Sequence, residues 1–248
     1  MKTLTRGLMG VMVVALGVSV SAEASAAGKI SFCGKQWPAD VKAITCNHRP
    51  DLKVIGAFRA LEKLDLSQAT LTDEGLKHIA GLKMLRALNL FRTPLSDVGL
   101  KHLSGLKALK KLNLMLTKVT DQGLKHLRRL KALKKLNLRD TKVTDAGLKH
   151  LAGLKALRSL NLDDTKVTDA GLKYLGGLKA LTWLNLGRTK VTDAGLKHLD
   201  GLKALDSLHL QLTKVTDTGM KHLAKLRTYL PRPRVVQGSE IISVPHVF

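Results

Sequence analysis

The sequence is poor in aromatic, cysteine and acidic residues for a length of 248 residues. Aromatic residues make up only 3% of the chain, whereas hydrophobic residues reach 44%, so Leu, Val and Ala must form the core. This apolar content also excludes a wholly disordered chain. Two cysteines are too few for a disulfide-dense mini-domain or a four-cysteine zinc site. No apolar run reaches the roughly 18 to 20 residues of a membrane span, which excludes a polytopic membrane protein.

The scarcity of acidic residues leaves a large positive charge. The chain has 42 Lys plus Arg against 19 Asp plus Glu, and its formal net charge is +23 at pH 7. An excess of this size is typical of proteins that contact nucleic acid, anionic lipid or other polyanions. Whether it marks such a function depends on where the basic residues lie along the chain.

The first 27 residues have the order of a secretory signal peptide. Lys2 and Arg6 precede an apolar stretch at 7–20, and small residues follow at 21–27 with small-x-small cleavage motifs. A retained N-terminal anchor is the alternative interpretation. We predict that residues 1–27 are a signal peptide and that the protein is exported to the periplasm, the cell envelope or the extracellular space.

Cys33 and Cys46 lie 13 residues apart just after this segment. An oxidising compartment favours a disulfide between them, and closing so short a loop contributes about 3 kcal/mol in the loop-entropy model. A metal or redox site is disfavoured because the sequence has no C-x-x-C and no paired ligand motif nearby. We therefore predict a disulfide here, with no metal and no cofactor.

A 24-residue repeat accounts for most of the remaining chain, with seven in-register copies at 61–228. Its consensus is L-x-x-L-x-L-x-x-T-x-V-T-D-x-G-L-K-x-L-x-x-L-K-x. In one copy Leu136 and Leu138 are two residues apart, so both face one side of an extended strand. Leu148 and Leu151 recur at the spacing of a helix face.

The turn between strand and helix also has a clear signature. A helix is expected to begin at this point. Thr144 and Asp145 can accept hydrogen bonds from its free backbone N–H groups, and the negative charge of Asp145 is favourable at its positive end. A single strand-turn-helix unit cannot cover its own apolar side, so stacked copies must bury one continuous core. Because helices are wider than strands, we expect an α/β horseshoe with a concave parallel sheet and short convex helices.

The repeat resembles that of the leucine-rich repeat family, over about two thirds of the chain. Its V-T-D-x-G-L segment is similar to repeats of many bacterial leucine-rich proteins and of F-box leucine-rich proteins. It differs from the shorter internalin repeats of about 22 residues. The family's ninth position is Asn, which ties the turn from copy to copy; here we expect threonine hydroxyls to make part of that ladder. These threonines are Thr93, Thr117, Thr141, Thr165, Thr189 and Thr213, with Ala69 in the first copy.

The two ends of the stack should be capped differently. Residues 28–60 are predicted to form an N-terminal cap that contains a half repeat at 50–60. After the last copy, Pro231 and Pro233 lie where the next strand would run, and proline cannot donate to a sheet ladder. We therefore expect the solenoid to stop there, with residues 229–248 as a loose tail or a partial cap.

The outward-facing strand residues should line the concave surface, where repeat proteins generally bind. The seventh and eighth positions vary most between copies, which fits either a specific contact surface or drift at solvent-facing positions. Two clusters are predicted: an apolar patch with a neighbouring cation, and a Trp and Arg pair near acidic residues. The alternative interpretation of Trp183 is a surface aromatic residue with no role in binding. The candidate ligand-binding residues are Phe91, Arg92, Met115, Leu116, Arg139, Asp140, Asp163, Asp164, Trp183, Arg188 and His209.

Histidines and aspartates also recur at fixed positions. A row of histidines offers neighbours side by side, whereas zinc needs three or four converging ligands, so a structural ladder is favoured. The aspartate row suggests calcium, but its place at each helix start already explains it. The histidines are His78, His102, His126, His150, His198 and His222, with Tyr174 in the missing place; the aspartates are Asp73, Asp97, Asp121, Asp145, Asp169, Asp193 and Asp217.

Three lysine rows contain 18 of the 42 basic residues, so much of the charge is one feature of the repeat unit. We place these rows on the outer and edge surfaces, where they would attract polyanions or simply maintain solubility. Sequence-specific nucleic-acid binding is not expected, because aromatic residues do not interleave with the rows and Lys outnumbers Arg. The rows are Lys77, Lys101, Lys125, Lys149, Lys173, Lys197 and Lys221; Lys83, Lys107, Lys131, Lys155, Lys179 and Lys203; and Lys118, Lys142, Lys166, Lys190 and Lys214.

No catalytic signature such as G-x-S-x-G, H-E-x-x-H or a phosphate-binding loop is present. The prediction is therefore a non-enzymatic, monomeric, exported scaffold that binds a protein partner through its concave face. One alternative is a cationic envelope protein that binds an anionic polymer or a membrane surface through its lysine rows. Another, implied by the resemblance to F-box proteins, is a substrate adaptor in ubiquitin ligation, but the chain lacks an F-box.

Overall fold

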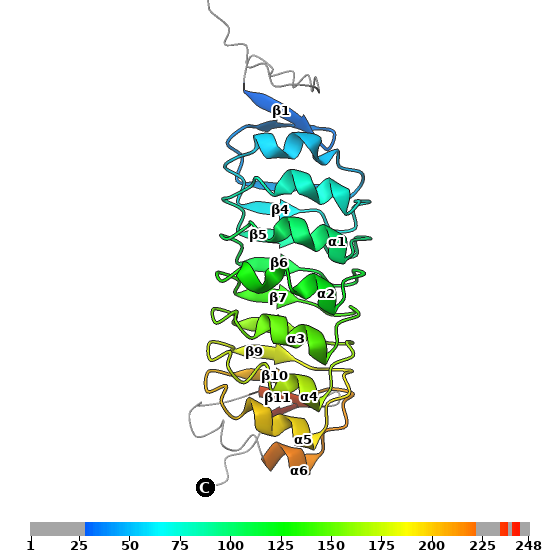
Figure 1. Ribbon diagram of the computed structural model, residues 1–248, viewed down its shortest axis with the longest axis vertical. Coiled ribbons are helices and arrows are strands. Elements are labelled where there is room, and N and C mark those ends of the chain that lie inside the picture. The colour runs from blue at the N-terminus through cyan, green and yellow to red at the C-terminus, as the bar shows by residue number, and fades with distance from the viewer. Residues whose placement is uncertain (1–27, 222–233, 238–239, 244–248) are drawn as a thin grey trace, which may run out of the picture.

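The computed structural model describes residues 28–221, 234–237 and 240–243. It shows an elongated stack of repeated units, with a sheet on one side and a layer of short helices over the other (Figure 1). This is the α/β leucine-rich repeat solenoid that the sequence predicts. The predicted signal peptide at 1–27 lies outside the described residues.

One ten-stranded sheet runs along the stack, in the spatial order β12-β11-β10-β9-β8-β7-β6-β5-β4-β3. Neighbouring strands from β3 to β11 are parallel, and equivalent residues of successive copies are paired, for example Leu88 with Leu112. The strands are β3 (Ala43–Thr45), β4 (Lys63–Asp65), β5 (Ala87–Asn89), β6 (Lys111–Asn113), β7 (Lys135–Asn137), β8 (Ser159–Asn161), β9 (Trp183–Asn185), β10 (Ser207–His209), β11 (Arg234–Gln237) and β12 (Glu240–Ser243).

The convex side consists of short helices, most of them a single turn. The α-helices are α1 (Asp97–Leu100), α2 (Asp121–Leu124), α3 (Asp145–Leu151), α4 (Asp169–Leu172), α5 (Asp193–Leu196) and α6 (Asp217–Met220). The 3₁₀ helices are η1 (Leu52–Ala57), η2 (Glu74–Ile79), η3 (Lys101–Leu103), η4 (Leu127–Arg129) and η5 (Lys197–Leu199). Such short helices are not stable alone, so the leucines beneath them must hold them in place.

The core consists of columns of leucine at equivalent positions of successive copies. Leu136 of strand β7 is 2% exposed, and Leu138 and Leu148 are fully buried. Each fully buried leucine contributes roughly 1.5–3 kcal/mol relative to an exposed one. The core is therefore formed by many equivalent contacts between aliphatic side chains, with few aromatic residues.

An aspartate ladder ties each copy to the next. The Asp121 carboxylate accepts hydrogen bonds from the Thr144 backbone N–H at 2.8 Å and from its Oγ1 at 2.6 Å. Thr144 Oγ1 in turn accepts from Ala146 N at 3.3 Å and so caps helix α3. The same arrangement recurs from Asp73 to Asp193. The aspartate row is therefore structural: each carboxylate orients the cap of the next helix.

The glycine of the T-D-x-G motif makes room for this ladder. A Cβ at Gly147 would overlap Asp121 Oδ1 and press against Leu124. The equivalent glycines from Gly99 to Gly219 meet the aspartate of the preceding copy in the same way, whereas Gly75 of the first copy meets Thr72 and Leu52. The glycine in this motif is therefore required by a tertiary contact between neighbouring copies.

The threonines of the ninth position act within a copy. Thr141 Oγ1 donates to the Leu138 carbonyl at 2.6 Å, and the threonines of the other copies do likewise. The expectation that these hydroxyls tie the turn from copy to copy is therefore wrong. A hydroxyl is too short to reach the next copy once it has bonded its own turn, and the aspartates make that link.

The N-terminal end is covered by a hairpin and a 3₁₀ helix. Strands β1 (Lys29–Phe32) and β2 (Lys35–Pro38) are antiparallel, and Phe32 packs edge-on against Phe58 with ring centroids 6.1 Å apart. Cys33 and Cys46 are joined as a disulfide pair with their Cα atoms 6.0 Å apart. The pair connects this hairpin to the loop that follows the first strand of the long sheet.

At the other end the sheet continues beyond the prolines. Strand β11 begins directly after Pro233 and pairs in parallel with β10, with Arg234 opposite Ser207. The antiparallel strand β12 then forms the last strand of the sheet. The sheet therefore continues past Pro231 and Pro233, contrary to the expectation that it ends there, because the prolines precede the strand and leave its own N–H donors intact. Both strands lie in the segment 229–248, for which a loose tail or a partial cap was expected.

Candidate ligand-binding surface

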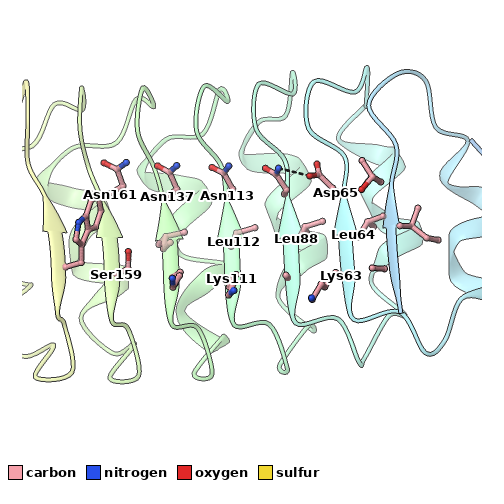
Figure 2. Close-up of a pocket in the computed structure, with 18 residues that line it drawn as sticks. Lys63, Leu64, Asp65, Leu88, Lys111, Leu112, Asn113, Asn137, Ser159 and Asn161 are labelled. Carbon is pink, nitrogen blue, oxygen red and sulfur yellow. Dashed lines mark hydrogen bonds between the residues drawn. The ribbon is translucent and has the colours of Figure 1, made fainter. Parts of the chain in front are cut away.

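A groove of about 590 Å³ crosses the outward face of the sheet from β3 to β9 (Figure 2). The third and fifth positions of each copy line it, because alternate residues of a strand face the same side. Trp183 lies at its C-terminal end. The groove therefore runs along most of the sheet, from the N-terminal cap to the sixth copy.

Three lysines line this groove: Lys63, Lys111 and Lys135. All three side chains are exposed. Within the part of the chain that the structure describes, none of them forms an ion pair with a carboxylate. The positive charge of the groove is therefore not neutralised internally.

A row of asparagine amides runs beside the lysines (Figure 2). Asn113 Oδ1 accepts from the backbone N–H two residues later at 3.1 Å, Asn137 does the same at 3.1 Å and Asn161 at 3.0 Å. Asn89 uses its Nδ2 to donate to Asp65 at 3.1 Å. These asparagines are not among the candidate ligand-binding residues predicted from the sequence, although their identity in neighbouring copies on the outward strand face is a signal that could have identified them.

The second half of the concave face is an ion-pair cluster centred on Asp163. Its Oδ2 lies 2.6 Å from Arg188 Nη2 and 3.2 Å from Arg139 Nε. Arg139 also lies 3.6 Å from Asp140, and Arg188 lies 3.3 Å from Asp164. The structure thus brings together five predicted site residues, three carboxylates and two guanidinium groups, in one ion-pair network.

Burial alters the acidity of Asp163, whose side chain is 3% exposed. Desolvation raises the pKa of this carboxyl, and Arg188 and Arg139 act against that rise. Its other oxygen, Oδ1, is buried without a hydrogen-bond partner among the described residues. Both guanidinium groups therefore contact the same carboxylate oxygen of Asp163, Oδ2.

Trp183 packs against His209, with ring centroids 5.2 Å apart. Ser207 Oγ lies 3.1 Å from His209 Nε2. Burial lowers the pKa of His209, while the negative charge of Asp163 raises it in opposition. The ring partner of Trp183 is thus a histidine on the adjacent strand, and both residues belong to the predicted site.

The predicted apolar patch lies on the turns that follow the strands. Phe91 and Met115 are half-buried, whereas Arg92 and Leu116 are exposed, with Leu116 41% exposed. Arg92 donates its backbone N–H to the Met115 carbonyl at 2.9 Å, which places these turns side by side. None of the four residues lines the groove. The patch and the groove are therefore separate surfaces.

The eighth position of every copy has a left-handed backbone. Its φ is 51° at Arg92, 57° at Leu116 and 55° at Asp140, and the other copies are alike. Residues other than glycine adopt this conformation at a cost in free energy. The turn geometry therefore imposes the backbone here while leaving the side chain free to vary.

The convex side has a smaller hollow of about 320 Å³ lined by Ser104, Lys125, His126, Arg128 and Arg129. This copy has two arginines where the next copy has Ala and Gly. Burial and neighbouring cations lower the pKa of His126. We call this cluster the basic notch.

Part of the lysine excess is structural. Lys131, Lys155 and Lys179 each donate to the carbonyl of a glycine in the turn that follows the helix of the next copy, at 3.1, 3.1 and 2.9 Å. These members of the second lysine row therefore link copies on the convex side.

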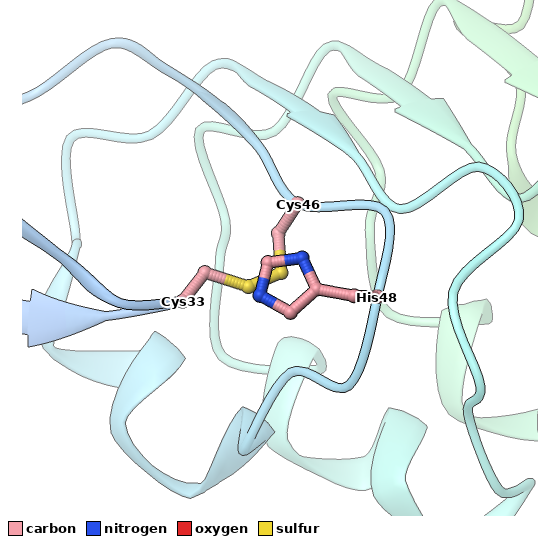
Figure 3. Close-up of side chains that lie close together, drawn as sticks. All are labelled: Cys33, Cys46 and His48. Atoms are coloured by element: carbon pink, nitrogen blue, oxygen red, sulfur yellow. A yellow bond between two sulfur atoms is a disulfide. The ribbon is translucent and has the colours of Figure 1, made fainter.

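Metal-ligand side chains converge at one place among the described residues: Cys33, Cys46 and His48 have ligand atoms within 4.8 Å of one another (Figure 3). The two sulfurs are joined as a disulfide, whereas the thiolate is the form that ligates metals. The five described histidines of the repeat row are half-buried and side by side; His222 lies outside the described residues. In residues 28–221, 234–237 and 240–243, no helix is long and apolar enough to cross a membrane.

Two leucine-rich repeat family models match the chain, one at 59–80, 81–104, 106–127 and 131–152 and the other at 155–215. Among solved structures, it is similar to internalin C2 from Listeria monocytogenes, with 25% identity and a TM-score of 0.68 over 87% of this chain and 90% of that one. It is also similar to an internalin, InlF, from the same organism, with 21% identity and a TM-score of 0.50 over 78% of this chain and 67% of that one. No sequence among curated proteins matches. The chain belongs to the leucine-rich repeat family.

Proposed function

We propose that this protein is a non-enzymatic, exported scaffold that binds a protein partner through its concave face. The groove across β3 to β9 carries this proposal, since it presents exposed polar side chains on a rigid sheet. Strands paired in register through their backbones keep these side chains at fixed spacing, which reduces the ordering cost of binding. The fold shared with internalin C2 supports the interpretation of the chain as a scaffold.

Export is supported by two features that lie next to each other in the chain. The charge and apolar order of residues 1–27 is that of a signal peptide. The Cys33 and Cys46 pair that follows would persist in an oxidising compartment.

Site-specific photocrosslinking tests the concave face directly. A photoreactive amino acid replaces Trp183 in the groove, and in a matched control it replaces Val98, which is 52% exposed on the convex helix α1. The full chain is then irradiated with secreted and envelope proteins of its own organism. We expect protease-sensitive adducts from position 183 and few from position 98. Equal yields at both positions, or no polypeptide adduct at position 183, would contradict the proposal.

The basic notch favours a second candidate function, the binding of an anionic polymer on the convex side. Lys125, Arg128 and Arg129 converge there around one hollow. Changing Arg128→Ala with Arg129→Gly restores the Ala-Gly found in the next copy and should leave the fold intact. If the notch binds polyanions, this variant should elute from a heparin column at clearly lower salt. Unchanged elution would remove the notch from consideration.

A further inference from the structure

Over strands β4 to β8 the groove presents lysine and asparagine donors and a single carboxylate, Asp65. We define the donor groove as Lys63, Lys111, Lys135, Asn113, Asn137 and Asn161. The ammonium groups and the three Nδ2 atoms have no acceptor among the residues that the structure describes. The one carboxylate in the lining, Asp65, already accepts from Ser67 N at 2.9 Å and Asn89 Nδ2 at 3.1 Å.

The orientation of the asparagine amides follows from the backbone. Each Oδ1 accepts from the N–H two residues later, for example Asn137 from Arg139 N at 3.1 Å. A backbone N–H can only donate, so the amide oxygen must face it and the Nδ2 must face away from it. The turn of each copy therefore places the amide nitrogen on the side of the preceding copy, as Asn89 shows by donating to Asp65 (Figure 2).

An extended chain laid across the strands would be long enough to reach all of these donors. Parallel strands lie about 4.8 Å apart, so β3 to β9 span about 29 Å, the length of roughly nine extended residues. Lys63 and Lys111 are two strands apart, or about 10 Å, and Lys135 is one strand further. Carboxylates of such a chain would complement the ammonium groups of the third-position row, and its backbone carbonyls would complement the amide groups of the fifth-position row.

On this basis we propose that the donor groove binds an extended acidic segment of a partner polypeptide. The proposal rests on the proposed function and specifies the chemistry of the partner. Carboxylates complement the unpaired lysines, and main-chain carbonyls complement the amide row. Single-stranded nucleic acid would need aromatic platforms for its bases, and the lining has one aromatic residue, Trp183.

Binding of a fluorescein-labelled deca-glutamate to the full chain tests this proposal, with deca-glutamine and a ten-nucleotide thymidine strand as comparison probes. The groove variant carries Lys63→Gln, Lys111→Gln and Lys135→Gln. The matched control carries Lys149→Gln, Lys173→Gln and Lys197→Gln on the convex side, which gives the same change in net charge. We expect the groove variant to bind deca-glutamate about ten-fold more weakly or worse, and the control to change less than about two-fold.

A second pair of substitutions isolates the amide donors. Asn113→Asp with Asn137→Asp keeps an oxygen for the backbone N–H but replaces each donor by a carboxylate. The chain itself shows that aspartate fits, since Asp65 occupies this position and accepts from Ser67 N. We expect this variant to keep its unfolding midpoint within a few degrees and to lose deca-glutamate binding. Retained binding would exclude the amide row from the site.

Three results would overturn the proposal. One is the absence of deca-glutamate binding, or equal binding of deca-glutamine. Another is equal weakening by the groove and convex triple variants, which would indicate diffuse charge attraction. The third is groove-dependent binding of the thymidine strand that is as tight as that of deca-glutamate. If crosslinking at position 183 still captures a polypeptide in any of these cases, the scaffold function stands and only the acidic partner class is wrong.

Discussion

The two halves of the concave face use the same backbone in opposite ways. In the N-terminal half, Lys111 and Asn137 project donors that have no partner among the described residues. In the C-terminal half, Asp163 is enclosed by Arg139 and Arg188, so both guanidinium groups have partners inside the molecule. Unpaired polar groups on a rigid surface are available to a ligand, whereas a closed ion-pair network contributes mainly to the native arrangement.

The difference arises from a few strand and turn positions. At the seventh position Arg139, Asp163 and Gly187 follow one another along the sheet, so opposite charges become neighbours at the distance of one strand. Over the N-terminal copies this position holds Ser67, Phe91 and Met115, which bring no charge of either sign.

The largest expected effect is the loss of the Asp163 carboxylate. Asp163→Ala leaves Arg139 and Arg188 without their shared partner, and we expect the free energy of unfolding to fall by about 2–4 kcal/mol. Asp164→Ala is the control, because that carboxylate is 49% exposed and makes a single contact to Arg188 Nε at 3.3 Å, worth less than about 1 kcal/mol. Urea unfolding measures both. Equal losses would show that the network is not centred on Asp163.

The aspartate ladder should be equally sensitive in both halves. Gly123→Ala places a methyl group against Asp97, and Gly195→Ala places one against Asp169. We expect each to cost about 1–3 kcal/mol through overpacking. Gly81→Ala is the control, since a Cβ there meets nothing within 4 Å and should be neutral or slightly stabilising. A clear difference between the thermal unfolding of the Gly123 and Gly195 variants would show that the aspartate ladder does not stabilise the two halves equally.

A smaller effect concerns pH and the C-terminal half. Burial lowers the pKa of His209 below 6.5, so the folded state binds this proton less readily than the unfolded state. The stability that the neutral imidazole contributes is present above pH 6.5 and is lost as the pH falls through the lowered folded-state value. His209→Gln should therefore flatten the decline in the free energy of unfolding between pH 7.5 and pH 5. An unchanged pH slope would contradict this assignment.

The smallest expected effect lies in the N-terminal half. Lys111→Gln and Lys135→Gln should change the free energy of unfolding by no more than about 0.5 kcal/mol, because neither lysine has an internal partner among the described residues. Denaturant unfolding of both variants at low and moderate salt is the measurement. A loss comparable to that of Asp163→Ala would erase the contrast between the two halves.

Sequence reasoning succeeded where a residue's role is local. The spacing of Leu136 and Leu138 identified the strand, and Thr144 identified the start of a helix, since the cap bonds a backbone group two residues away. It failed where a group's partner lies one copy away. Asp121 was assigned to its own helix, and its partner proved to be Thr144, 23 residues later.

The candidate site shows the same division. The acidic and basic residues around Asp163 were named from the sequence, but which carboxylate is buried depends on the neighbouring strands. Trp183 was expected near Arg188, and the structure shows His209 as its ring partner. The asparagines were not predicted as donors, because the repeat pattern does not show whether the amide oxygen or the amide nitrogen already has a hydrogen-bond partner.

The charge of +23 illustrates what each level decides. The repeat pattern by itself determined the solenoid, since leucine periodicity dictates which side of each unit must be buried and stacking is the way to bury it. Only the tertiary structure decided the role of each cation. Lys131 donates to the next copy, Arg188 neutralises Asp163, and Lys111 remains exposed in the groove. The physical reason is that a charge's effect depends on which groups surround it in space, and neighbouring copies supply those groups.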